Sequence, residues 1–162
     1  MLRSAAIVFS LAVTLLLPGQ LPAASAQAPN FTLSGPQGVI ALQEYRGRVV
    51  YLDFWASWCS PCRKSFPWMN ALQERYADDG LVVLAVNLDR ETAAARQFLK
   101  KYPAGFTVAF DPNGTVAERY ELKGMPSSYL IDRQGNLVMS HVGFRTADAD
   151  RLEARIKAQL EQ

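Results

Sequence analysis

The sequence Cys59-Ser60-Pro61-Cys62 stands between an apolar run, residues 49–55, and a helical pattern that starts near Pro61. These are the only two cysteines of the chain. Two thiols three residues apart, at a strand-to-helix turn, can close a reversible disulfide. Because the closed loop is tiny, such a bond constrains the unfolded chain very little and would be a poor stabiliser. The spacing therefore favours a bond that is made and broken in redox chemistry.

The composition is that of an ordinary globular chain with one domain and an end segment. The 162 residues are 49% hydrophobic and 20% charged, which provides the apolar material for a core. The formal net charge is +2, from 17 basic and 15 acidic residues, and like charges form no block. Neither nucleic acid nor an acidic membrane surface is therefore indicated as a partner.

The first 26 residues have the pattern of a secretory signal peptide. Arg3 gives a positive start, residues 5–17 are uncharged and mostly apolar, and residues 24–26 have the small-x-small pattern of a cleavage site. The alternative is an uncleaved membrane anchor, but the apolar run is shorter than the roughly 20 residues that spanning requires. We therefore expect cleavage after Ala26, a domain over residues 27–162 and a periplasmic location.

Hydrophobic periodicity and turn residues predict an α/β fold. Strands that alternate with helices favour a mostly parallel sheet with helices on both faces, to which a late hairpin adds antiparallel strands. The expected strands are a leading hairpin around the turn at 34–38 and the runs 49–55, 81–88, 107–110, 128–131 and 137–142. The expected helices are 61–78, with a kink at Pro67, then 91–101 with Ala94 and Phe98 inward, 115–120, and a last helix capped by Thr146.

Two segments carry a resemblance to a known family. Residues 53–62, Asp-Phe-Trp-Ala-Ser-Trp-Cys-Ser-Pro-Cys, resemble the thioredoxin active-site segment. Residues 124–132, Gly-Met-Pro-Ser-Ser-Tyr-Leu-Ile-Asp, resemble the cis-proline loop and the following strand of that superfamily. With the leading hairpin, the signal pattern and an αβ insertion at about 91–110, the chain is similar to the TlpA/ResA branch of exported thioredoxins.

The resemblance covers nearly all of residues 27–162. It implies a thioredoxin fold, a central mixed sheet flanked by helices, with an N-terminal β-hairpin and a central αβ insertion. It also implies a thiol:disulfide oxidoreductase that exchanges disulfides with exported proteins and uses no metal or organic cofactor. Its electrons would come from a membrane-embedded thiol transporter.

The two cysteines are expected to have different roles. Cys59 is the expected nucleophile, because it precedes a helix whose free backbone N–H groups and positive dipole end favour a thiolate. Cys62 lies one turn further on, is expected to be more buried, and would resolve the mixed disulfide. Ser60 and Pro61 shape the turn and tune the potential, and Pro61 is tolerated because a first-turn residue needs no N–H bond.

Asp53 is the one charged residue of an otherwise apolar strand, six residues before Cys59. A buried carboxyl is costly unless it has a role or a partner, and desolvation should raise its pKa. The resemblance implies that it accepts the proton of Cys62 as that thiol attacks. The alternative is a strand-end aspartate bonded to a neighbour such as Lys64 or to water.

Trp58, Met125 and Pro126 are the expected substrate-binding residues beside the Cys pair. Trp58 abuts Cys59 and is expected at an exposed apolar rim, whereas Trp55 is in part core. The resemblance implies a cis bond before Pro126, so that the preceding backbone pairs with an extended substrate. A flexible Met125 suits varied partners, although an ordinary trans turn with a space-filling Met is the alternative.

Three polar residues count against a zinc site and against a role in cytochrome c maturation. The lone histidine, His141, is expected on a strand surface, and two Cys with one His cannot form a four-ligand zinc site within one chain. Relatives specialised for cytochrome c maturation commonly carry Glu where this chain has Ser65 and Ser127. Those two departures count against a cytochrome c biogenesis role and favour a broader range of substrates.

Three other functions remain as alternatives. The same fold could act as a disulfide donor, although no basic residue lies between the cysteines to favour a strong oxidant. A redox-inactive binding or chaperone module would have been supported by loss of a cysteine or of Pro126, and all are present. A peroxidase usually keeps Thr or Ser three residues before the reactive Cys, where this chain has Ala56.

Overall fold

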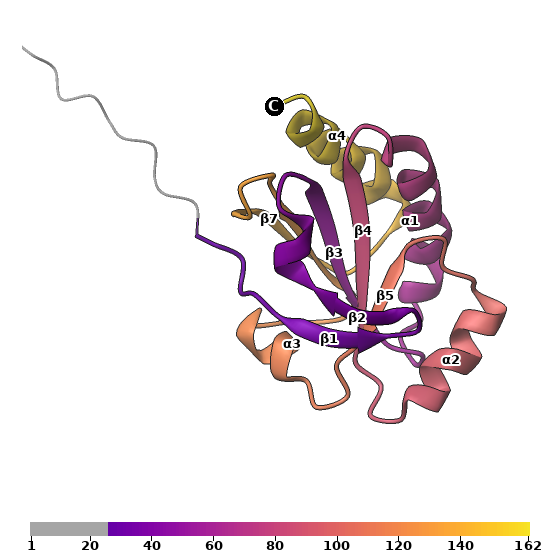
Figure 1. The fold of residues 1–162 in the computed structure, drawn as a ribbon. Helices are drawn as coiled ribbons and strands as arrows, with labels where there is room; N and C mark the ends of the chain where they lie inside the picture. Colours follow the sequence, from indigo (N-terminus) through magenta and orange to yellow (C-terminus); the bar gives the residue numbers. More distant parts are fainter. Residues whose placement is uncertain (1–25) are drawn as a thin grey trace, which may run out of the picture.

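The computed structural model describes residues 26–162, so the predicted signal peptide lies outside the described residues except for Ala26. Figure 1 shows one sheet with helices packed against it. The strands are β1 Thr32–Gly35, β2 Gly38–Ala41, β3 Val49–Trp55, β4 Leu81–Asn87, β5 Thr107–Phe110, β6 Ser127–Ile131 and β7 Leu137–Val142. The helices are α1 Cys62–Tyr76, α2 Thr92–Lys101, α3 Thr115–Arg119 and α4 Ala149–Leu160, with 3₁₀ turns η1 Leu42–Tyr45 and η2 Thr146–Asp148.

The sheet is mixed, in the order β2-β1-β5-β4-β3-β6-β7. The described pairs β3–β4 and β4–β5 are parallel, whereas the other four neighbouring pairs are antiparallel. The central mixed sheet with a leading hairpin is confirmed, but the prediction of a mostly parallel sheet was wrong. The reason is that the hairpin joins β5 antiparallel through Ser34 and Phe110, and β6 returns antiparallel along β3.

Strands β3 and β4 lie in the middle of the sheet, and all seven residues of each are buried. They pair in parallel from Val49 opposite Leu81 to Trp55 opposite Asn87. Continuous apolar runs of this kind suit strands that are covered on both faces. The two strands therefore end at the same edge of the sheet, where the segment that carries the cysteines begins.

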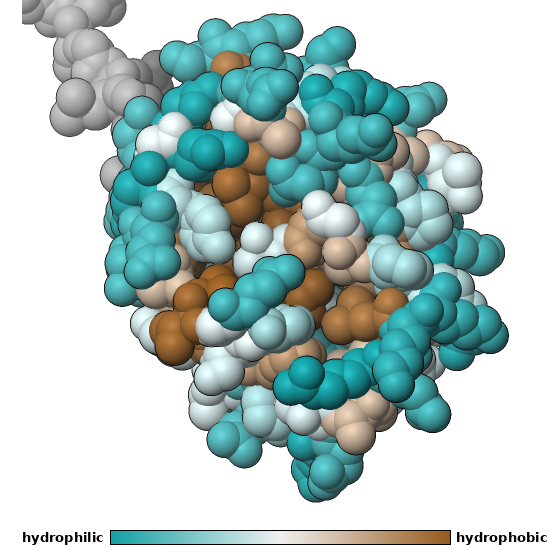
Figure 2. Space-filling view, turned by 45° about the vertical axis from the view of Figure 1, so that its right-hand side comes forward, coloured by the Kyte–Doolittle hydropathy of each residue, from teal (hydrophilic) through white to brown (hydrophobic). Residues whose placement is uncertain are grey.

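Apolar side chains form a separate core on each face of the sheet. Beneath α1, α2 and α4, Trp55 packs against Phe66 and Phe98 with ring centroids 4.9 and 4.8 Å apart. The other face is covered by the hairpin, η1 and α3, whose buried residues include Phe31, Leu42, Val116 and Tyr120. Figure 2 shows that the apolar side chains that reach the surface of one side form separate patches between polar ones.

Two details of the helices differ from the sequence predictions. In α2 the fully buried alanine is Ala95, while Ala94 is only half-buried, because a one-residue rotation of the helix brings its neighbour inward. Thr146 begins η2 and makes no side-chain cap, and α4 starts only at Ala149. Helix α1 includes Pro67 and continues to Tyr76.

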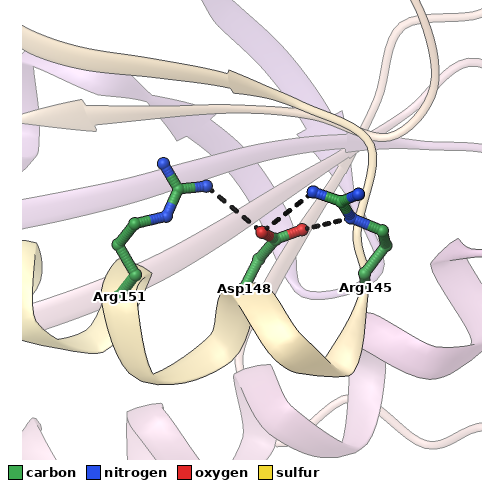
Figure 3. Close-up of polar contacts among 3 residues, drawn as sticks. All are labelled: Arg145, Asp148 and Arg151. Atoms are coloured by element: carbon green, nitrogen blue, oxygen red, sulfur yellow. Dashed lines mark hydrogen bonds and ion pairs between the residues drawn. The ribbon is translucent and has the colours of Figure 1, made fainter.

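The start of α4 is held by a cluster of two arginines around one carboxylate (Figure 3). Asp148 accepts hydrogen bonds from Arg145 at 2.9 and 3.2 Å and from Arg151 at 3.2 Å. The Arg145 hydrogen bond lowers the pKa of Asp148 below its usual range, so the carboxylate stays charged beside the helix N-terminus. The cluster thus lies at the residue that precedes α4. None of the described helices is long and apolar enough to cross a membrane.

Candidate active site

The two cysteines lie where the chain passes from β3 into α1. Cys62 is the first residue of α1, and Cys59 is in the turn before it. Their sulfur atoms are bonded, and their Cα atoms are 5.3 Å apart. The disulfide that the spacing predicted is therefore present in the structure, and both described cysteines take part in it.

The start of α1 directs a donor at the sulfur of Cys59. The backbone N–H of Cys62 donates a hydrogen bond to Cys59 Sγ over 3.3 Å. A first-turn N–H has no partner inside its own helix, and together with the helix dipole it favours negative charge at this sulfur. Cys62 is fully buried while Cys59 keeps 3% exposure, so the order of burial agrees with the prediction.

Asp53 lies in the interior of β3, with 2% of its surface exposed. Its Oδ2 has no hydrogen-bond partner within residues 26–162, and burial raises its pKa well above the usual range. The alternative partner, Lys64, is exposed and forms no ion pair with it in the described structure. Its cross-strand neighbours are Ala85 on β4 and Ser128 on β6, so no charged side chain sits beside it in the sheet.

A buried polar network holds the turn that leads to Cys59. The Asp89 carboxylate accepts hydrogen bonds from the Ser57 N–H and the Ser57 hydroxyl, both at 2.9 Å. It also accepts one from the Asn87 amide at 2.8 Å, and the Asn87 Oδ1 accepts the Asp89 N–H at 3.0 Å. The sequence predictions missed these residues, although Asn87 ends β4 and Asp89 follows it. Because β4 runs parallel to β3, both residues lie at the edge of the sheet where β3 ends.

The second loop of the site contains Pro126. The bond between Met125 and Pro126 is cis, as the resemblance implied. The Pro126 carbonyl accepts the N–H of Gly143 at 2.7 Å, and the Ser127 hydroxyl donates to the Gly124 carbonyl at 2.8 Å. Met125 is half-buried and packs against the core cluster that contains Cys59.

A surface groove of about 650 Å³ brings Trp58 and Met125 together. Trp58 is 66% exposed, in agreement with an expected place at the rim. The groove is also lined by Leu88, Ala117 and Leu122, with Glu118, Glu121 and Lys123 at polar positions. The substrate-binding role of Trp58 and Met125 stays a prediction. Within the described residues, no group of three or more His, Cys, Asp or Glu side chains is placed to hold a metal ion.

Replacing Asp89 should destabilise the protein. Asp89→Ala leaves the Ser57 N–H and the Asn87 amide without an acceptor in a buried setting, which should cost about 2–3 kcal/mol of unfolding free energy. Asp89→Asn keeps one acceptor oxygen and should lose less. Urea unfolding of the oxidised protein measures both. An Asp89→Ala variant as stable as wild type would show that the network does not hold this turn.

Asp53 should make stability depend on pH. Its folded pKa is raised, so above about pH 4 the unfolded chain binds fewer protons than the folded one. The free energy of unfolding should then fall as pH rises, by up to about 1.4 kcal/mol per pH unit, until the pH passes the folded pKa. The Asp53→Asn variant has no carboxyl to ionise here, so its free energy of unfolding should not fall in this way. It should equal that of wild type near pH 4 and exceed it at pH 7.

Urea unfolding of the oxidised protein between pH 4 and pH 8 measures this difference. Asp78→Asn is the matched control, because Asp78 is exposed just after α1. For this variant the plot of unfolding free energy against pH should run parallel to that of wild type. Parallel curves for wild type and Asp53→Asn would contradict a raised pKa at Asp53.

Comparison with known proteins places this geometry in a family. The Redoxin family matches residues 23–156. The thiol-disulfide oxidoreductase ResA of Bacillus thuringiensis subsp. konkukian is 35% identical over 132 residues, which cover 81% of this chain and 75% of the relative. ResA of Bacillus subtilis is 34% identical over 120 residues, covering 74% of this chain and 67% of that protein.

Solved structures agree with the sequence relatives. A crystal structure from Chlorobium tepidum, described as a thiol:disulfide interchange protein DsbE, has a TM-score of 0.83 and 55% identity, covering 84% of this chain and 96% of that chain. The exposed lipoprotein thioredoxin Etrx1 of Streptococcus pneumoniae has a TM-score of 0.70 and 32% identity, covering 80% and 99%. The chain belongs to the Redoxin family and, within it, to the ResA-like thiol-disulfide oxidoreductases.

Proposed function

We propose that this oxidoreductase is exported and reduces disulfides of other exported proteins through a dithiol–disulfide cycle of Cys59 and Cys62. The observation that carries the proposal is the hydrogen bond from the Cys62 N–H to Cys59 Sγ at 3.3 Å. It favours the thiolate at the outer sulfur, while the inner sulfur is fully buried. The pair therefore has one sulfur suited to attack a substrate and one suited to release it.

The cycle begins with the reduced protein. The Cys59 thiolate attacks one sulfur of a substrate disulfide, the substrate S–S bond breaks, and a mixed disulfide forms as the first substrate thiolate leaves. The Cys62 thiolate then attacks Cys59 Sγ, which releases the second substrate thiolate and closes the Cys59–Cys62 bond. The substrate gains two electrons and the protein loses two. A membrane-embedded thiol transporter would return them.

Asp53 supplies the base for the second step. Cys62 must lose its proton to become a nucleophile, and it is buried away from water. Asp53 is buried on the face of the sheet that α1 covers, and burial raises its pKa, so its carboxylate is a stronger base than an exposed one. We assign it as the group that takes the Cys62 proton. Ser60 and Pro61 shape the turn between the two sulfurs.

The groove beside the cysteines is the proposed substrate site. Trp58 and Met125 offer apolar contacts from two different loops, and both line the groove. Met125, just before Pro126, packs against the core cluster that contains Cys59, so the backbone of this loop is proposed to pair with an extended substrate chain. Recognition that uses one apolar rim and backbone pairing suits many disulfide-containing proteins rather than a single partner.

The two serines at family positions support a broad substrate range over cytochrome c biogenesis. Ser65 is buried and donates its hydroxyl to the Cys62 carbonyl at 3.1 Å. Ser127 is also buried, and its hydroxyl is bonded to the Gly124 carbonyl. Both hydroxyls are hydrogen-bonded to backbone carbonyls, and neither serine brings the charge that a glutamate would bring to the cysteines.

Residues 1–26 would act as the signal peptide, cleaved after Ala26, and the enzyme would then be located in the periplasm.

Trapping tests the proposed cycle. A Cys62→Ala variant can attack a substrate but cannot resolve it, so it should accumulate mixed disulfides with exported proteins that disappear on treatment with dithiothreitol. The measurement is a non-reducing gel of periplasmic extract, with Cys59→Ala as the matched control that should trap nothing. The absence of mixed disulfides in the lanes of both variants would refute the mechanism.

Turnover of insulin without turnover of peroxide would exclude the peroxidase and binding-module alternatives.

A further inference from the structure

A row of three polar residues crosses the sheet beside the cysteines. Asp53 on β3 lies opposite Ser128 on β6, and Ser128 lies opposite His141 on β7. Directly opposed residues of antiparallel strands share one face, with Cβ atoms about 5 Å apart. The row two residues away, formed by Tyr51, Leu130 and Met139, packs in the core beneath α1. Because side chains alternate along a strand, the polar row lies on that same face.

The ends of this row have polar atoms without partners. Asp53 Oδ2 and His141 Nε2 are both buried, and neither has a hydrogen-bond partner among residues 26–162. Ser128 between them is 3% exposed. Burial, and after it the charge of Asp53, raises the pKa of the Tyr51 hydroxyl, whereas Ser128 lowers it. Such groups are rarely left unpaired in a core, so a structural role alone does not account for them.

His141 connects the interior with solvent. The residue as a whole is half-buried, on β7 at the edge of the sheet, while its Nε2 points away from water. The prediction of a plain strand-surface residue therefore needs correction, because a sequence pattern gives the strand but not the inward turn of the ring. An imidazole with one buried and one more accessible nitrogen can take a proton on one side and release it on the other.

Asp53 needs such a connection if it takes the proton of Cys62. At 2% exposure it cannot pass a proton directly to bulk water. Its neighbour on β4 is Ala85, the residues of α4 buried in the core are Leu152 and Ile156, and the buried residues of α1 are Cys62, Ser65, Phe66, Met69 and Leu72. The Ser65 hydroxyl is bonded to the Cys62 carbonyl. The polar side chains opposite Asp53 along the row, Ser128 and His141, lie on β6 and β7 and lead toward the edge of the sheet.

We propose that Ser128 and His141 form the route by which the proton that Asp53 takes from Cys62 leaves the protein. The inference rests on the proposed function and assigns two further residues to it. Neither Asp53 Oδ2 nor His141 Nε2 is bonded to Ser128 in the described structure, so the Ser128 hydroxyl must first turn to bridge them. The protonated Asp53 then donates to the Ser128 oxygen as the Ser128 O–H gives its proton to His141 Nε2. The imidazolium then releases a proton to solvent from its other nitrogen. Asp53 returns to the carboxylate, Ser128 is again a hydroxyl, and no electron moves. His141 is left as the neutral Nε2–H tautomer, which must exchange its ring proton with solvent before the next cycle.

Stopped-flow reaction of the reduced protein with 5,5′-dithiobis(2-nitrobenzoate) tests this route. Attack by Cys59 releases one nitrothiolate in a phase that depends on reagent concentration, and resolution by Cys62 releases a second in a phase that does not. His141→Gln keeps a polar side chain that cannot titrate. It should slow the second phase about tenfold, below the ~100-fold that a directly acting base contributes, and leave the first phase unchanged.

The matched control is Ser140→Gln, since Ser140 is the exposed neighbour of His141 and faces the other side of the sheet. The double variant Asp53→Asn, His141→Gln should be no slower in the second phase than Asp53→Asn alone, because both changes interrupt one path. A merely structural role of His141 would slow both phases or add to the loss at Asp53. Should His141→Gln fail to fold, Ser128→Ala removes the middle hydroxyl and should show the same pattern.

The outcomes separate this inference from the proposed function. Release of fewer than two nitrothiolates per wild-type molecule would refute the dithiol cycle itself. Two equivalents from wild type with an unchanged second phase in His141→Gln and Ser128→Ala would leave the cycle standing and overturn the proton route. An additive loss in the double variant would also overturn it.

Discussion

The central strand β3 is the constraint on which the site depends. All seven of its residues are buried, and it is hydrogen-bonded to β4 on one edge and to β6 on the other. Its position fixes three things at once: the carboxyl of Asp53 in the interior, the turn that carries Cys59 at the sheet edge, and the start of α1 at Cys62. The polar network of Asp89 then holds that turn against the end of β4. Rigid elements thus set the geometry of both sulfurs, and a loop alone could not hold it as precisely.

The two sulfur atoms of the site lie in different electrostatic surroundings. At Cys59 a backbone N–H and the helix N-terminus favour negative charge. Asp53 and Cys62 are both buried, and burial raises the pKa of Asp53, which supports its proposed role as the acceptor of the Cys62 proton. With Ala85 beside it on β4, Asp53 has no basic neighbour there to lower its pKa. The sheet itself, through Ser128 and His141, then offers the polar connection outward.

Much of the fold could be predicted from the sequence because local signals determine it. Apolar runs and turn residues predicted β3, β5 and β7 with their observed bounds, and the Cys pair with its flanking tryptophan located the site. Strand direction was not predictable in this way, because an apolar run reads the same in a parallel and in an antiparallel pair. The inward face of α2 was one residue off, at Ala95 rather than Ala94, since a short helix tolerates a small rotation. Asp89 was missed, and His141 was predicted only as a strand-surface residue, because their surroundings depend on residues that only the folded sheet brings together.

The measurement that tests the central claim most directly is the reduction potential of the Cys59–Cys62 pair, obtained by equilibrating the protein in dithiol redox buffers. The Cys62 N–H directed at Cys59 Sγ would favour a thiolate in the reduced protein, but no basic residue lies between the two cysteines, so we expect a reductant. A potential near or below about −220 mV, in the range of glutaredoxins and thioredoxins, is the predicted result. A potential near roughly −120 mV would contradict it, because the protein would then donate disulfides instead of reducing them.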